Sequence, residues 1–231
     1  MSAANPPETI ERRNAAGALV ERATFRGGVL DGPTVLFGPE ALAAAEIGFA
    51  AGVRDGPMVL YDTDGAVLAR LTYRAGVLDG PATLYAGGKP LTEMTYAAGV
   101  GDGPLRSFTP AGGLAASGAL RRGRLHGAFT IFRPDGSVMQ LQHYVGGLLE
   151  GEQLDLDPAG VVRRRAEYRA GRLDGTVTHY DAAGQPTAHQ VFVADKEVTA
   201  APPPGVSKMP TPQKPWLQRW WDAAKALIGR Q

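Results

Sequence analysis

The residues best suited to catalysis or ligand binding form a row of carboxylates that recurs at nearly constant spacing. Each stands immediately before a glycine, about 24 residues after the previous one. The row consists of Asp31, Asp55, Asp79, Asp102, Glu150 and Asp174, with His126 in the remaining place. Such a row is a potential metal or ligand site; alternatively, each carboxylate accepts hydrogen bonds from turn N–H groups. Glutamate and histidine in two places favour the second interpretation, because they indicate a tolerant structural position.

Histidines are the other candidates for catalysis. The four in the chain, His126, His143, His179 and His189, occupy different positions of the repeat. His179 and His189 fall on adjacent predicted strands and are expected to approach each other. The sequence has no cysteine, nucleophile elbow, paired-carboxylate signature or metal-ligand spacing. It therefore predicts a non-enzymatic protein with no cofactor and no metal.

These residues belong to a repeat that is clearest at Gly76-Val77-Leu78-Asp79-Gly80. The same glycine-bounded motif occurs seven times, which indicates a repeat architecture. Its other copies are Gly28–Gly32, Gly52–Gly56, Gly99–Gly103, Gly123–Gly127, Gly147–Gly151 and Gly171–Gly175. A second glycine usually precedes the motif by eleven residues, as in Asp64-Gly65 and Asp135-Gly136. Two short runs between two glycine turns predict one β-hairpin per repeat.

Aromatic residues recur at two positions of the repeat, each near the end of a predicted strand. The first position holds Phe37, Tyr61, Tyr85, Phe108, Phe132 and Tyr180, with Leu156 once. The second holds Phe25, Phe49, Tyr73, Tyr96, Tyr144, Tyr168 and Phe192, with Leu120 once. We expect two aromatic rows along one sheet, where cross-strand pairs contribute roughly 0.2–1 kcal/mol each.

The face opposite the first aromatic position changes character along the chain. It is apolar in the early repeats and polar in most of the later ones. Its residues are Leu36, Leu60, Leu84, Ser107, Ile131, Asp155 and His179. We expect Leu36, Met58, Leu60 and Leu84 to be covered by a protein partner, a second copy or the chain's own tail.

The two ends of the chain differ from the array, which we place at residues 14–198. Residues 1–13 form an N-terminal extension, and residues 199–215 form a proline-rich linker. Residues 216–230 are predicted to be an amphipathic helix with all three tryptophans. Its apolar stripe comprises Trp216, Leu217, Trp220, Trp221, Leu227 and Ile228.

Three interpretations of this helix remain open. It folds back as a cap on the array, docks into a groove of a partner, or lies on an anionic membrane. Residues 201–231 carry five lysines and arginines against one aspartate, a net charge of +4. The proline-rich linker favours docking to a partner or a membrane, because it can extend away from the array. The length of the apolar stripe favours the cap, because such a stripe is usually buried.

The remaining composition bounds the protein class. We expect no signal peptide, because residues 1–13 lack an apolar core, and no long apolar membrane span. The default is therefore a soluble cytoplasmic protein. The slightly acidic array predicts no nucleic-acid binding, and we interpret Arg163-Arg164-Arg165 as a solvated strand segment.

The segment from Tyr73 to Pro81 and the segment from Phe132 to Gly136 resemble the MORN-repeat family, in its variant, antitoxin-like bacterial form. The resemblance covers roughly residues 14–198. It implies an elongated single-layer antiparallel sheet of seven to eight hairpins that binds or scaffolds other molecules, with no catalytic residues. The departures from the family pattern are Gly101, the Arg121-Arg122 pair, and Asp195–Val198 where an eighth motif would start.

The sequence therefore predicts an all-β protein with a C-terminal amphipathic α-helix, acting as a non-catalytic scaffold for a protein partner. The binding surface is the sheet, the C-terminal helix, or both. An antitoxin-like or immunity role is the specific form that the resemblance implies. Self-association into a homo-oligomer and peripheral membrane association are the alternatives.

Overall fold

The computed structural model describes residues 5–201, and every element in this range is a β-strand. The all-β prediction is therefore confirmed for this part of the chain. The predicted helix at residues 216–230 lies outside the described residues. The chain divides into two compact units, unit 1 (Met1–Gly112) and unit 2 (Gly113–Gln231), and each is an antiparallel sheet.

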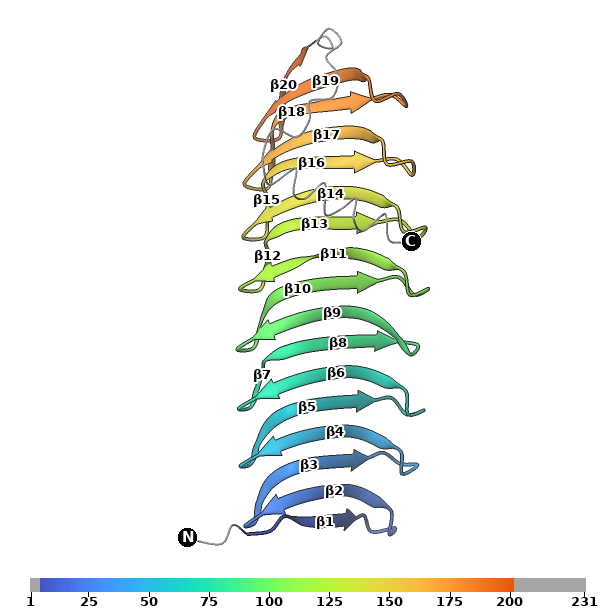
Figure 1. Cartoon of the computed structure of the whole chain (residues 1–231), viewed down its shortest axis with the longest axis vertical. Helices are drawn as coiled ribbons and strands as arrows, with labels where there is room; N and C mark the ends of the chain where they lie inside the picture. Colours follow the sequence, from blue (N-terminus) through green and yellow to red (C-terminus); the bar gives the residue numbers. More distant parts are fainter. Residues whose placement is uncertain (1–4, 202–231) are drawn as a thin grey trace. The chain divides into compact units, whose positions relative to one another are not determined.

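The described residues of unit 1 form ten strands. These strands follow one another in chain order through the sheet (Figure 1). Their bounds are β1 (Glu8–Arg13), β2 (Leu19–Arg26), β3 (Val29–Phe37), β4 (Ala43–Ala50), β5 (Val53–Tyr61), β6 (Val67–Arg74), β7 (Val77–Leu78), β8 (Gly80–Ala86), β9 (Lys89–Ala97) and β10 (Val100–Phe108). β1 lies in the segment assigned as an N-terminal extension, and it pairs with β2 as the first strand of the sheet.

In residues 113–201, the described part of unit 2, ten further strands repeat this arrangement. Their bounds are β11 (Leu114–Arg121), β12 (Arg124–Leu125), β13 (Gly127–Phe132), β14 (Val138–Val145), β15 (Leu148–Leu149), β16 (Gly151–Leu156), β17 (Val162–Arg169), β18 (Arg172–Tyr180), β19 (Pro186–Val193) and β20 (Lys196–Ala201). In both units successive strands pair antiparallel, so the predicted series of hairpins is confirmed.

The glycine motif begins in a two-residue hairpin turn. At the third copy, Ala75 and Gly76 both have positive φ, 48° and 83°. These values suit a type I′ turn, whose twist matches that of the flanking strands. At the φ of Gly76, a residue with a Cβ would be strained, whereas glycine is not. The first glycine is therefore needed for the turn itself.

A hydrogen bond between successive repeats fixes the position of each turn. The N–H of Gly76 donates to the carbonyl of Arg54 at 2.7 Å, and that of Gly99 donates to Leu78 at 2.8 Å. In unit 2, the N–H of Gly171 donates to Leu149 at 2.8 Å. The same motif therefore makes the turn and attaches it to the preceding repeat.

The two aromatic rows lie on opposite faces of the sheet. Phe37 follows Val35 by two residues and shares its face, where the Arg22 guanidinium lies 5.9 Å from the Phe37 ring centre. Phe49 follows Ile47 by two residues and shares the other face with Met58. The repeat therefore places one aromatic side chain on each face.

The largest group of buried apolar side chains lies in unit 2. Val138, Leu141, Leu154, Leu156 and Val162 are each at most 7% exposed, and Phe132 and Tyr180 pack against them. Unit 1 instead buries mainly small residues, including Ala23, Ala45 and Ala69. Small buried residues leave the larger leucines around them nearer to solvent.

Candidate protein-binding face

One face of unit 1 carries a continuous apolar row. Strand register places Ala45 between Leu36 and Leu60, and Ala69 between Leu60 and Leu84. Leu36 and Leu60 are half-buried, and Leu84 is 46% exposed. The expectation that Leu36, Leu60 and Leu84 share a face is confirmed.

A second apolar row runs beside the first. Met58 pairs with Ile47 on one side and with Leu71 on the other, and all three side chains are half-buried. Met58 shares the face of Leu60, because the two residues are two positions apart in β5. We call this surface the leucine face and define it by Leu36, Met58, Leu60 and Leu84.

On the opposite face of unit 1, charged side chains form ion pairs with one another. Arg22 pairs with Glu11 at 2.9 Å, and Arg106 pairs with Glu93 at 3.7 Å. The two faces of the unit therefore differ sharply. The leucine row is apolar from Leu36 to Leu84, and the ion pair Arg12–Glu21 borders it at Leu36, the register partner of Glu21.

In unit 2, the polarity of the two faces is reversed from β14 to β17, although Ile131 of β13 stays apolar at its position in the row. The positions that correspond to the leucine row hold Gln140, Asp155 and Arg164, which are successive register partners. Leu141 and Leu154 pair with each other on the opposite face. The predicted change from apolar to polar is therefore accompanied by a transfer of the apolar residues to the other face.

The row of carboxylates serves the turns, as its structural interpretation predicted. Asp55 Oδ2 accepts the N–H of Ala75 at 2.9 Å, and Asp79 Oδ2 accepts that of Ala98 at 3.1 Å. Glu150 Oε2 accepts the N–H of Ala170 at 2.8 Å. In residues 5–201, no group of three or more acidic or histidine side chains is placed to hold a metal ion.

Removal of one such carboxylate provides a test of this role. We expect Asp55→Ala to lower the free energy of unfolding by about 0.5–1.5 kcal/mol, because the turn loses its acceptor. The measurement is urea denaturation followed by far-ultraviolet circular dichroism. Asp64→Ala is the control and should change stability by less than about 0.5 kcal/mol. Asp64 contributes its backbone N–H to its turn, which alanine keeps. Equal losses in the two variants would contradict the role of Asp55.

The histidines do not form a pair. His179 lies opposite Ala188 in the β18–β19 register, whereas His189 lies opposite Thr178. His179 and His189 therefore point to opposite faces, and the expectation that they approach each other is wrong. His143 Nδ1 lies 3.3 Å from the carbonyl oxygen of Glu150, and it donates to that oxygen in the tautomer that carries a proton on Nδ1.

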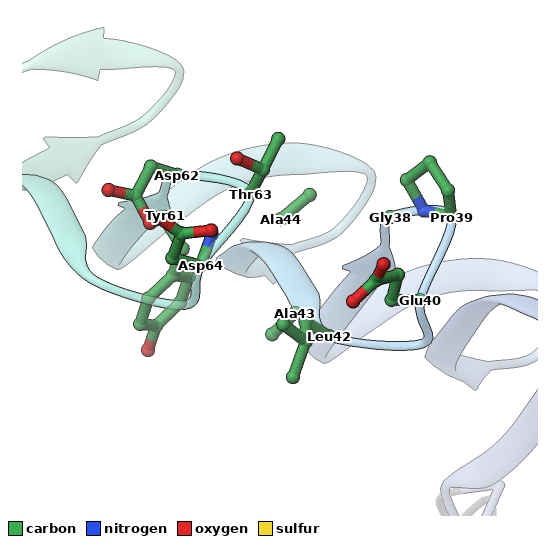
Figure 2. Close-up of a pocket in the computed structure, with 10 residues that line it drawn as sticks. All are labelled: Gly38, Pro39, Glu40, Leu42, Ala43, Ala44, Tyr61, Asp62, Thr63 and Asp64. Carbon is green, nitrogen blue, oxygen red and sulfur yellow. The ribbon is translucent and has the colours of Figure 1, made fainter.

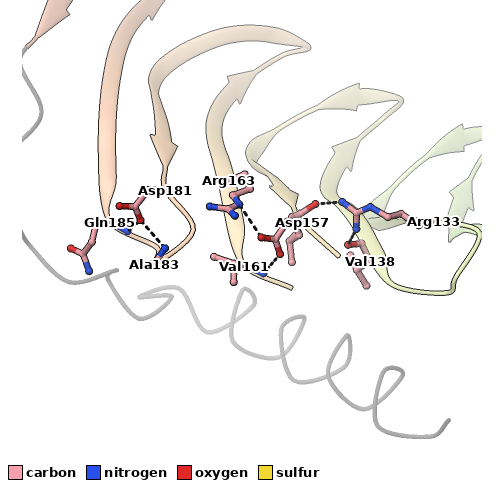
Figure 3. Close-up of polar contacts among 9 residues, drawn as sticks. Arg133, Val138, Asp157, Val161, Arg163, Asp181, Ala183 and Gln185 are labelled. Carbon is pink, nitrogen blue, oxygen red and sulfur yellow. Dashed lines mark hydrogen bonds and ion pairs between the residues drawn. The ribbon is translucent and has the colours of Figure 1, made fainter. Parts of the chain in front are cut away.

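At the opposite ends of the strands, aspartates organise the longer turns of unit 2 (Figure 3). Asp181 Oδ1 accepts the N–H groups of Ala183 at 2.9 Å and Gln185 at 2.8 Å. Asp157 Oδ1 accepts the N–H of Val161 at 2.9 Å, and Asp157 also pairs with Arg163 at 2.9 Å. A carboxylate two residues before its N–H partner is typical of an Asx turn.

The arginine run of β17 is ion-paired, not simply solvated as expected. Arg163 pairs with Asp157, and Arg164 pairs with Asp155 at 3.2 Å. Arg165 pairs with Glu152. Cross-strand neighbours therefore supply a carboxylate for each charge in the run.

Asp157 gives this region a dependence on pH. The N–H of Val161, followed by the charge of Arg163, lowers the pKa of Asp157 below its ordinary value. A lowered folded-state pKa adds stability that is present above the unfolded pKa of about 3.9 and lost below it. We expect Asp157→Asn to flatten the loss of stability between about pH 5 and pH 2. Free energies of unfolding of the wild type and of Asp157→Asn, measured across this pH range, test the prediction. Parallel curves for the two proteins would contradict it.

A shallow pocket lies between two of the longer turns of unit 1 (Figure 2). It has a volume of about 380 Å³ and is lined by Glu40, Leu42, Tyr61, Asp62 and neighbouring residues. Asp62 Oδ1 already accepts two turn N–H groups, at 3.0 and 2.8 Å. The Tyr61 hydroxyl donates to Glu46, and burial followed by this contact raises the pKa of Tyr61. These groups support the turns, so the pocket is a weaker candidate than the leucine face.

The other predicted binding residues, Trp216, Leu217, Trp220, Trp221, Leu227 and Ile228, lie outside the described residues. Among residues 5–201, no helix is long and apolar enough to cross a membrane. In comparisons with known proteins, no family model and no curated protein matches this chain.

Proposed function

We propose that the chain is a non-catalytic scaffold that binds a protein partner through the leucine face of unit 1. The observation that carries this proposal is the row Leu36–Leu60–Leu84, which ends in a leucine that is 46% exposed. Apolar side chains in adjacent strands gain free energy when a partner removes them from water, at about 25 cal/mol per Å². The polar contacts of the opposite face make it the poorer binding surface.

The non-catalytic part of the proposal is supported by the way in which the reactive side chains are used. Asp55, Asp79 and Glu150 accept turn N–H groups, and their repeated positions make them structural. His179 and His189 lie on opposite faces and do not form a catalytic pair. Asp55 and Asp79 therefore hold the turns of the hairpins that present the leucine face.

At the family level, we propose membership of the MORN-variant group, on the basis of the glycine motif and the antiparallel hairpins. An antitoxin-like role would then consist of covering a surface that the partner needs for its activity. Measurement of partner activity with and without this protein tests that role. A partner whose activity is unchanged when fully bound would contradict it.

A photo-crosslinking experiment tests the proposed binding face directly. A photoreactive amino acid is placed at position 84, and irradiated complexes from the native cells are identified by mass spectrometry. Position 68 is the matched control, because Leu68 is 45% exposed but is the extra residue of the β5–β6 bulge, outside the leucine row. A discrete protein adduct at position 84, absent at 68, is expected. Equal adducts at both positions, or adducts to lipid, would contradict a protein-binding leucine face.

A further inference from the structure

An arginine at the hairpin turn is paired with a carboxylate in three repeats. This arginine stands two residues before the first glycine of the motif, and the carboxylate stands just before the second. The pairs are Arg26–Asp31 at 3.6 Å, Arg74–Asp79 at 3.6 Å and Arg169–Asp174 at 3.9 Å. The repeat thus has a built-in position for an anionic group beside its turn arginine.

The repeat that begins unit 2 keeps the arginine but lacks the carboxylate. Arg121 occupies the arginine position, and His126 occupies the carboxylate position. Two more arginines, Arg122 and Arg124, flank the glycine of the turn. Arg121 and Arg124 are direct register partners, so two like charges face each other across the hairpin. Such an arrangement is destabilising unless an anion lies nearby.

In other repeats, the carboxylate at this position also accepts a turn N–H of the next repeat, and His126 brings no carboxylate for this contact. In this unit, Glu150 accepts the N–H of Ala170, which precedes the first glycine of the next motif. One repeat earlier, Gly146 holds the place of Ala170 and His126 holds the place of Glu150. The N–H of Gly146 therefore has no carboxylate from this position. Arg121, Arg124, His126 and Gly146 line one pocket of about 450 Å³. One pocket therefore gathers guanidinium groups and a turn N–H that a carboxylate serves elsewhere in the array.

We propose that this pocket binds a carboxylate from an acidic segment of the protein partner. The proposal rests on the protein-binding function proposed above and adds a charged contact to the apolar one. Guanidinium groups recognise carboxylates through paired, charge-assisted hydrogen bonds, and the ligand carboxylate would occupy the place that Asp79 and Asp174 occupy in their own repeats. The Arg121 and Arg124 side chains are exposed, so binding should weaken as salt concentration rises.

The test is titration of the full chain, labelled with ¹⁵N, with a hexaglutamate peptide, followed by NMR. We expect saturable shifts of the Gly146 and Gly147 amides, and none with hexaglutamine. Arg124→Gln should weaken binding about tenfold, which corresponds to the loss of one hydrogen bond between charged groups. Arg172→Gln is its matched control, because Arg172 has the same place in a repeat that keeps Asp174. It should leave the affinity within about twofold.

Two variants of His126 test whether the anion position is vacant, and they distinguish weaker binding caused by filling that position from weaker binding caused by loss of structure. His126→Asp restores the carboxylate of the repeat and should weaken hexaglutamate binding at least about tenfold without lowering the urea midpoint. His126→Ala leaves the position vacant and should bind as the wild type does. Equal affinities of the Asp and Ala variants would overturn the proposal. Binding of inorganic phosphate without binding of hexaglutamate would overturn the acidic-segment assignment. If Leu84→Glu weakens partner binding by at least about 30-fold in these cases, the proposed function stands and only this inference fails.

Discussion

Replacement of Leu141 by alanine is expected to lower the free energy of unfolding by about 2–5 kcal/mol. Leu141 is 1% exposed and packs in the cluster with Val138, Leu154, Leu156 and Val162. Alanine removes most of its apolar contacts and leaves a cavity that a hydrogen-bonded sheet cannot easily close. Urea denaturation, followed by circular dichroism, measures the change.

The matched control for this prediction is Leu148→Ala. Leu148 lies in the short strand β15, and it is 51% exposed. Its truncation removes little buried surface and should cost less than about 0.5 kcal/mol. A loss at Leu141 no larger than that at Leu148 would show that the cluster does not stabilise unit 2.

Replacement of Gly48 by alanine is expected to destabilise unit 1 by about 1–3 kcal/mol. A Cβ at this position would lie 2.4 Å from the carbonyl oxygen of Asp55 and 3.4 Å from that of Pro57. Both are backbone atoms in the paired strand, so they cannot rotate away as a side chain could. The clash must be relieved by a shift of β4 against β5, which disturbs their hydrogen bonds.

The control for Gly48 is Gly38→Ala. A Cβ at Gly38 would lie 3.7 Å from the carbonyl oxygen of Leu42, an ordinary contact distance. Its effect should therefore remain within about 0.5 kcal/mol. Thermal unfolding followed by circular dichroism compares the two variants, and equal melting temperatures would refute the clash at Gly48.

The repeat made much of this fold predictable from the sequence. A period of about 24 residues with two glycine turns implies hairpins, because positive φ is needed at each tight turn. The capping role of Asp55 was likewise predictable, since tolerance of Glu150 in the same position indicates a turn acceptor rather than a metal ligand. Alternation along β3 and β5 was enough to place Leu36 and Leu60 on one face.

Other features depend on details of register that the sequence pattern does not carry. The faces of Phe37 and Phe49 follow from how β3 pairs with β4, and those of His179 and His189 follow from how β18 pairs with β19. The constraint on Gly48 arises from a carbonyl oxygen in the neighbouring strand, so no local pattern reveals it. The vacant carboxylate position beside Arg121 was visible only as a departure from the repeat until the Arg–Asp pairs of the other turns were known.

The most direct test of the binding function is the affinity of the crosslinked partner, once purified, for matched variants of the leucine face. Leu84→Glu is expected to weaken binding by at least about 30-fold, because a buried charge replaces an apolar contact. Leu68→Glu should leave the affinity within about twofold, since Leu68 is equally exposed but lies outside the leucine row. The same affinity for both variants would contradict the proposal that the leucine face of unit 1 binds the partner.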